Sequence, residues 1–125
     1  MYTKHVRPVA EYAVPVWGTI ITSKESQEIE RLQKCALSVI YGNQSYSKLL
    51  TKSGLATLSE RREQLMMKFT KKVCKINTFD DLFKKANKTV NTRQKSKMFE
   101  ETPARTNRFF KSPIPVMSRL ANQFN

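Results

Sequence analysis

The sequence predicts an all-α protein, a small bundle of four or five helices followed by an extended basic C-terminal tail. Three observations lead to this prediction. Apolar residues recur at helical spacing along most of residues 1–86, two segments begin with capping-box patterns, and the 125-residue chain contains only 3 glycines. So few glycines disfavour the many tight turns of a small all-β fold. Apolar residues make up 39% of the chain, which suffices for a modest core.

The first predicted helix covers Tyr2 to Ala13, with Pro8 near its start or at a kink. Pro15 ends this helix because a proline disfavours the helical conformation of the residue before it. Residues 16–21 then form an apolar loop that pivots on Gly18. The large apolar side chains in this loop suggest that it packs against another element.

The second predicted helix begins after Thr22 and ends before Gly42. Thr22 and Glu25 have capping-box spacing, and glycine is favoured just beyond a helix. The expected apolar face consists of Ile29, Leu32, Ala36, Val39 and Ile40, with Leu37 at its edge. Gln33 falls within this face, so its amide needs hydrogen-bond partners. We expect these hydrogen-bond partners to be either the backbone of the loop around Trp17 or water at the edge of the face.

Two further helices follow in the sequence pattern. A short helix from Tyr46 to Lys52 is expected to close at Gly54. Thr57 and Glu60 form the second capping-box pattern, which opens a long helix reaching about Ile76. The expected apolar face of this long helix consists of Leu58, Leu65, Phe69, Val73 and Ile76.

Another short helix is expected to start at Thr78, with Leu82 and Phe83 as its packing residues. It completes the predicted helical domain, residues 1–86. Residues 87–125 are expected to form a basic tail, which is partly disordered because it holds few apolar side chains.

The predicted tail contains eight Lys or Arg and two Glu. Residues 87–107 are expected to be extended or disordered. Near the end of the chain, Ser112 can cap a short terminal helix that carries Val116, Met117 and Leu120.

The charge balance predicts an anionic partner. The chain has 23 Lys and Arg against 10 Asp and Glu, a net charge of +13. A compact protein with this charge repels itself, and nucleic acid is the simplest partner that offsets the repulsion.

The long helix places a basic stripe along one side. Arg61, Lys68 and Lys75 are spaced i, i+7, i+14 and so lie within an arc of ~40°, while Lys71 and Lys72 flank them. Two interpretations remain open for these five residues. They form either a phosphate-binding surface or a solvated face that keeps the protein soluble.

The sequence contains no set of residues typical of an active site or a metal site. His5 is the only histidine, and Cys35 and Cys74 lie far apart without a further metal-ligating partner. Asp80 and Asp81 are the only aspartates, and adjacent carboxylates at a helix start do not form a two-metal site. We therefore expect no catalytic residue, no metal and no cofactor. Cysteine usage and the lack of a membrane span predict an intracellular protein, nuclear or cytoplasmic.

Four segments together are similar to one family. They are VRPVAEYAVPVW (Val6 to Trp17), IERLQKCAL (Ile29 to Leu37), TLSERR (Thr57 to Arg62) and TNRFFKSPIP (Thr106 to Pro115). These segments resemble the C-terminal region of reverse transcriptases from non-LTR (LINE-type) retrotransposons, and the resemblance covers essentially the whole chain.

The resemblance implies the helical thumb and post-thumb region of an RNA-directed DNA polymerase. In that family the fingers and palm, with the catalytic aspartates, precede this region, so the resemblance implies a truncated fragment that is not an enzyme by itself. The expected partners are RNA or an RNA–DNA duplex, bound without sequence preference, and the polymerase body of the full-length protein. No membrane partner is expected.

Two alternatives stay open beside this interpretation. The chain could be a helical protein-interaction module that docks on a polymerase body through an apolar surface formed by Trp17, Ile20, Ile21 and Tyr41. It could also be a truncated product without function.

Overall fold

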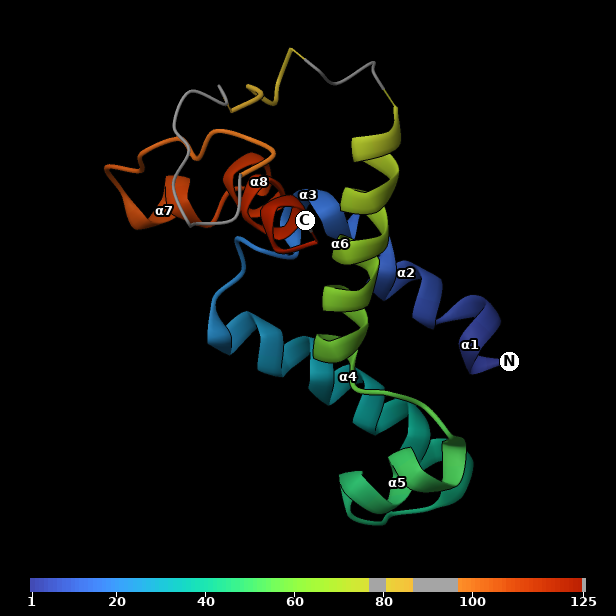
Figure 1. Cartoon of the computed structure of the whole chain (residues 1–125). Coiled ribbons are helices and arrows are strands. Elements are labelled where there is room, and N and C mark those ends of the chain that lie inside the picture. Colours follow the sequence, from blue (N-terminus) through green and yellow to red (C-terminus); the bar gives the residue numbers. More distant parts are fainter. Residues whose placement is uncertain (77–80, 87–96, 125) are drawn as a thin grey trace. The chain divides into compact units, whose positions relative to one another are not determined.

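The structure, a computed structural model, describes residues 1–76, 81–86 and 97–124, and these residues form eight helices (Figure 1). The helices are α1 (Tyr2–His5), α2 (Arg7–Glu11), α3 (Val14–Trp17), α4 (Ser23–Tyr41), α5 (Tyr46–Ser53), α6 (Leu58–Lys75), α7 (Asn107–Phe110) and α8 (Pro113–Gln123). Within the described ranges, β pairing is limited to one isolated bridge between Lys85 and Phe99. The predicted all-α class is therefore confirmed.

The chain packs as two units. The first consists of Met1–Val14 and Ile21–Gln64, and the second of Pro15–Ile20 and Leu65–Asn125. Helix α6 is continuous and contributes residues to both. This division differs from the boundary expected after residue 86. The C-terminal segment shares a core with the second half of α6, because it contributes large buried side chains to that core.

The predicted first helix is divided at Val6 into α1 and α2. Pro8 lies in the first turn of α2 and has no N–H to continue the hydrogen bonds of α1. The expected loop at residues 16–21 was also partly wrong, because α3 occupies its beginning. Of the described residues with positive φ, Ala13 (φ 52°) is the one in this region. The chain also turns at residues 18–20, where the Ile20 N–H donates to the Trp17 carbonyl (3.0 Å).

Helix α4 begins and ends where the sequence predicts. Thr22 Oγ1 accepts a hydrogen bond from the Glu25 N–H (3.3 Å), and the Thr22 N–H donates to Glu25 Oε2 (2.7 Å). These reciprocal bonds complete a capping box. Gly42 follows the helix with φ 87°, a conformation that glycine adopts without a steric penalty.

The buried face of α4 differs from the expected apolar face. Gln33 and Leu37 are each only 1% exposed, whereas Leu32 is 67% and Val39 is 87% exposed. The expectation for Leu32, Val39 and Ile40 was therefore wrong. The hydrogen bonds of Gln33 hold it inside the first unit, which leaves the opposite side of the helix facing out.

A polar network surrounds Gln33 at the centre of the first unit. Gln33 Oε1 accepts from the Tyr2 hydroxyl (2.8 Å), and Gln33 Nε2 donates to the Tyr46 hydroxyl (3.0 Å) and to the Ala56 carbonyl (3.2 Å). The Tyr46 hydroxyl donates to Glu30, which also accepts from the Leu58 N–H at the start of α6 (3.1 Å). The expected partners of Gln33, around Trp17, were wrong. Together, Gln33 and Glu30 of α4 join α1, α5 and the start of α6.

The network predicts a loss of stability in alkaline solution. Burial, together with the hydrogen bond to Glu30, raises the pKa of Tyr46 above its usual value of 10. The folded state therefore favours the neutral phenol, and its stabilising effect is complete below pH 10 and lost as the pH rises through the raised pKa. We expect the free energy of unfolding, measured with urea, to fall above pH 10. The fall should be smaller in Tyr46→Phe, whereas Tyr41→Phe, at an exposed tyrosine, should behave like the wild type.

Gly54 ends α5 in the left-handed conformation, with φ 64° and ψ 24°. The space around it is open, because nothing lies within 4 Å of an added Cβ. Gly54→Ala should therefore act through backbone strain alone and lower the free energy of unfolding by about 1 kcal/mol. Thermal unfolding followed by circular dichroism measures this effect. Lys52→Ala, at an exposed position of the same helix, should cost less than about 0.5 kcal/mol.

Helix α6 buries a face that is rotated from the expected one. Leu58 and Val73 are buried as predicted, but Met66 and Thr70 are also buried, and Ile76 is partly exposed. Thr70 is accommodated because its hydroxyl donates to the Met66 carbonyl one turn earlier (2.9 Å).

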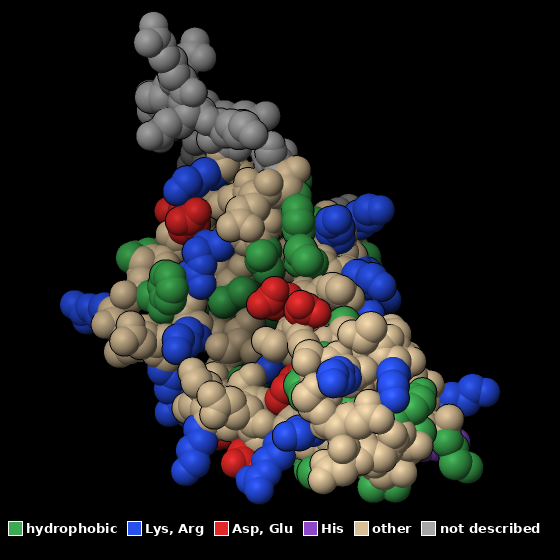
Figure 2. Space-filling model, turned by 90° about the horizontal axis from the view of Figure 1, so that it is seen from below, with side chains coloured by type: hydrophobic (Ala, Val, Ile, Leu, Met, Phe, Trp, Pro, Cys, Tyr) green, Lys and Arg blue, Asp and Glu red, His purple; other side chains and the backbone are tan. Residues whose placement is uncertain are grey.

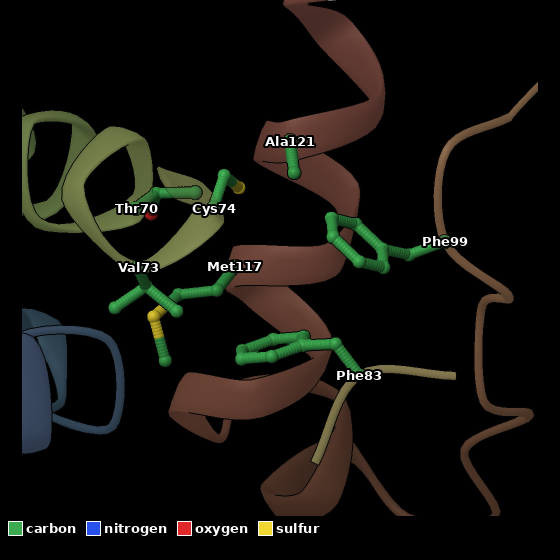
Figure 3. Close-up of a pocket in the computed structure, with 7 residues that line it drawn as sticks. All are labelled: Thr70, Val73, Cys74, Phe83, Phe99, Met117 and Ala121. Carbon is green, nitrogen blue, oxygen red and sulfur yellow. The ribbon is translucent and has the colours of Figure 1, made fainter. Parts of the chain in front are cut away.

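The core of the second unit lies between α6 and α8 (Figure 3). Met66 and Val73 of α6 pack with Met117 and Ala121 of α8, and with Phe83 and Phe99 from the intervening segments. The two phenylalanine rings are tilted by 52° with their centroids 5.5 Å apart, a favourable aromatic arrangement.

Asn122 fastens the segment before α7 to α8. Its Oδ1 accepts from the N–H groups of Met98 (2.9 Å) and Phe99 (3.0 Å), and its Nδ2 donates to the Phe99 carbonyl (3.1 Å). The terminal helix predicted after Ser112 is confirmed as α8. The described part of the expected tail is thus held by specific contacts, because Phe99 reaches the core.

The short helix expected from Thr78 falls partly outside the described residues. In the described part, residues 81–83 form a turn and not a helix. Phe83 is buried as predicted, whereas Leu82 is mostly exposed.

Candidate nucleic-acid interface

Four of the five predicted cations are exposed on one stretch of α6. Lys68, Lys71, Lys72 and Lys75 occupy exposed positions of the helix, away from its buried residues Met66, Thr70 and Val73. The core contacts of the second unit hold this stretch, so the lysines stand on a fixed scaffold. For Lys68, Lys72 and Lys75, the described residues include no ion-pair partner.

Arg61 does not belong to this exposed group. Its Nε lies 3.1 Å from Glu11 Oε1, which Arg7 Nε also contacts at 2.6 Å. Arg61 is therefore engaged in an ion pair that connects α6 to α2 within the first unit, and we expect it to contribute less to phosphate binding than the exposed lysines. The sequence could not reveal this pairing because Glu11 lies 50 positions away.

We expect Arg61→Gln to leave nucleic-acid affinity within about twofold of the wild type. The side chain is already paired with Glu11, so its loss should weaken the first unit by at most about 1 kcal/mol. Lys72→Gln is the matched comparison on the same helix and should weaken binding. Fluorescence anisotropy with a labelled duplex measures the affinity of both variants. Equal losses of affinity would contradict the expectation that Arg61 contributes less to binding than Lys72.

Lys71 has a specific neighbour. Its Nζ lies 4.8 Å from the centroid of the Phe124 ring, just beyond the end of α8. This cation–π contact keeps the ammonium group exposed while it restricts where the side chain reaches.

The positive charge is concentrated in the unit that carries these lysines. The second unit contains 14 Lys and Arg against 4 Asp and Glu, a net charge of +10, while the first contains 9 against 6, a net charge of +3. Figure 2 shows exposed Lys and Arg side chains, with hydrophobic side chains and fewer Asp and Glu side chains among them. The field around α6 therefore favours an anion.

In the described part of the chain, the cavity between α6 and α8 is too small for a small-molecule substrate. The cavity lined by Thr70, Cys74, Phe99 and Met117, among others, holds about 10 Å³, no more than one water molecule (Figure 3). Burial raises the pKa of the Cys74 thiol, which opposes the lowered pKa that a reactive cysteine needs. Among the described residues, no group of three or more His, Cys, Asp or Glu could hold a metal ion.

The predicted apolar interaction surface is divided between the two units. Trp17 and Ile20 belong to the second unit, whereas Ile21 and Tyr41 belong to the first. Ile20 and Tyr41 are exposed, while Trp17 and Ile21 are partly buried. Sequence reasoning missed the most exposed apolar residues of α4, Leu32 and Val39, because it assigned them to the core.

Comparison with known proteins found no family model, curated protein or solved structure that matches this chain. In the described part of the chain, no helix combines the length and the apolar character needed to cross a membrane.

Proposed function

We propose that this chain binds RNA or an RNA–DNA duplex through the sugar-phosphate backbone, without reading sequence. The observation that supports this function best is the group of exposed lysines on α6, in the unit with a net charge of +10. Phosphate contacts position a protein on a nucleic acid but carry no sequence information. The exposed cations on this stretch of α6 are lysines, whose point charges suit backbone binding.

The resemblance to non-LTR retrotransposon reverse transcriptases supports the same function. A thumb region grips the template–primer duplex by its shape and charge, which requires no base contacts. We propose that this chain contributes such a grip to a polymerase, and that these 125 residues bind nucleic acid but do not catalyse synthesis.

The test is binding of a labelled RNA–DNA duplex at about 50 and 200 mM salt, followed by fluorescence anisotropy. We expect a dissociation constant of roughly 10⁻⁴–10⁻⁶ M at physiological salt, tighter binding at the lower salt, and equal values for two unrelated sequences of the same length. Binding that ignores salt, or that differs strongly between the two sequences, would contradict the proposal.

A second candidate function is docking on a protein. The exposed apolar residues Leu32, Val39 and Ile40 on α4 support it, because contiguous apolar surface often marks an interaction site. Such docking would be insensitive to salt, so the titration above separates the two functions.

A further inference from the structure

The C-terminal segment carries three phenylalanines with similar exposure. Phe109 is 43%, Phe110 is 50% and Phe124 is 45% exposed. All three belong to the second unit, where the positive charge is concentrated. Large aromatic rings at a strongly basic surface need a physical explanation, because water solvates them poorly.

Two of these rings hold a cation over one face. The Arg119 guanidinium carbon lies 3.8 Å from the centroid of Phe110, and Lys71 Nζ lies 4.8 Å from the centroid of Phe124. Among the described contacts, the ring of Phe109 has no cation over it. The exposed rings therefore differ in their electrostatic surroundings although their exposure is nearly equal.

The surrounding structure fixes both ring–cation pairs. Arg119 Nη2 also donates to the Phe110 carbonyl (2.8 Å), so one residue of α8 holds both the ring and the backbone at the end of α7. Phe124 follows α8, whose buried residues Met117 and Ala121 anchor that helix in the core with α6. Glu101, a nearby carboxylate, forms its ion pair with Lys97 (3.3 Å).

An aromatic ring beside a cation matches the chemistry of an unpaired nucleotide. Its base can stack on the ring or on the guanidinium plane, while its phosphate is attracted to the positive charge. The bases of a duplex are already stacked on each other and cannot use such a position. A ligand that uses both groups therefore contains single-stranded nucleic acid.

We propose that Phe110 with Arg119, and Phe124 with Lys71, bind unpaired nucleotides. The nucleic acid recognised by the second unit then includes a single-stranded segment as well as the duplex backbone bound by the α6 lysines. This inference rests on the proposed function, since it extends the same basic surface, and Lys71 belongs to both sites.

The experiment compares two probes, a blunt RNA–DNA duplex and the same duplex with a single-stranded RNA overhang. The wild type should bind the overhang probe more tightly. Phe110→Ala and Phe124→Ala should each weaken overhang binding by roughly 5- to 150-fold. Binding of the blunt duplex should not change in Phe110→Ala, and in Phe124→Ala, whose ring contacts Lys71, it should weaken far less than overhang binding does. Phe109→Ala is the matched control and should leave both affinities unchanged. Phe110→Trp and Phe124→Trp, which keep an aromatic face, should retain overhang binding.

The outcomes distinguish this inference from the function on which it rests. If Phe110→Ala and Phe124→Ala bind both probes like the wild type, or if Phe109→Ala loses as much overhang binding as they do, the inference fails and duplex binding stands. If the wild type binds neither probe at low salt, the proposed function fails as well. Far-UV circular dichroism must show wild-type helix content for each alanine variant. If a folded variant loses the same affinity for both probes, the inference is overturned.

Discussion

Gln33→Leu should lower the free energy of unfolding by about 3–5 kcal/mol, the largest effect expected of a single substitution in this chain. Leucine has a similar volume but cannot replace three hydrogen bonds. The Tyr2 hydroxyl, the Tyr46 hydroxyl and the Ala56 carbonyl would each lose the bond to Gln33, and of these groups Tyr46 keeps its bond to Glu30. A buried polar group left without a partner costs about 1–3 kcal/mol, and the substitution would remove the Gln33 bond from two more groups, the Tyr2 hydroxyl and the Ala56 carbonyl.

The measurement is urea or thermal unfolding, followed by far-UV circular dichroism. Gln27→Leu is the control, because it makes the same chemical change at an exposed position of α4. It should alter stability by less than about 0.5 kcal/mol. If Gln33→Leu cost less than about 1 kcal/mol, the network would not hold the first unit together. Gln33 lies in the first unit. A partial unfolding transition confined to that unit would show that the network stabilises the first unit and not the second.

The triple variant Lys68→Gln/Lys72→Gln/Lys75→Gln should weaken binding of an RNA–DNA duplex by roughly 10- to 100-fold near 0.1 M salt. Each lysine that contacts a phosphate releases about one counterion on binding. Removing three contacts should therefore reduce the slope of log affinity against log salt by about 2 to 3 units. These side chains are exposed, so the fold should tolerate the change.

The control for the triple variant removes the same charge from the other unit. Lys24→Gln/Lys34→Gln/Lys48→Gln alters three exposed lysines of the first unit. It should change the salt slope by less than one unit, because these lysines do not belong to the exposed group on α6 that is proposed to contact phosphates. Equal losses in the two triple variants would mean that net charge, and not the surface of α6, governs binding.

Local interactions explain why the helix ends could be predicted. The capping box of Thr22 with Glu25, and the glycines after α4 and α5, involve residues at most a few positions apart. The same holds for the proline that starts α8. Such signals act whatever the rest of the chain does, so they can be read directly from the order of the residues.

The buried faces of the helices could be predicted only in part. The pattern on α4 assigned Leu32 and Val39 to the core, because apolar spacing identifies a candidate face but not the element that covers it. The structure buries Gln33, which the sequence placed within that face, through bonds to residues 13 to 31 positions away, and leaves Leu32 and Val39 exposed. A hydropathy pattern cannot predict which distant groups will supply the three hydrogen bonds that such an amide needs.

The candidate site shows the same division. The sequence placed Lys68, Lys71, Lys72 and Lys75 on one helix, and the structure leaves them exposed there. The sequence alone could not show that Glu11 pairs with Arg61, or that Phe124 lies beside Lys71. The role of Asn122 was equally hidden, since a polar residue near the end of a helix has no distinctive pattern.

By itself, the sequence determined the all-α class, the bounds of α4 and α5 to within one residue, the start of α8, and the excess of positive charge. Each follows from composition or from contacts between near neighbours in the chain. Only the tertiary structure decided which helix faces are buried, which arginine is already paired, and which aromatic rings meet a cation. Those features depend on residues that folding brings together from different parts of the sequence. The burial, hydrogen bonds and charge contacts that stabilise them form only when the groups are close in space.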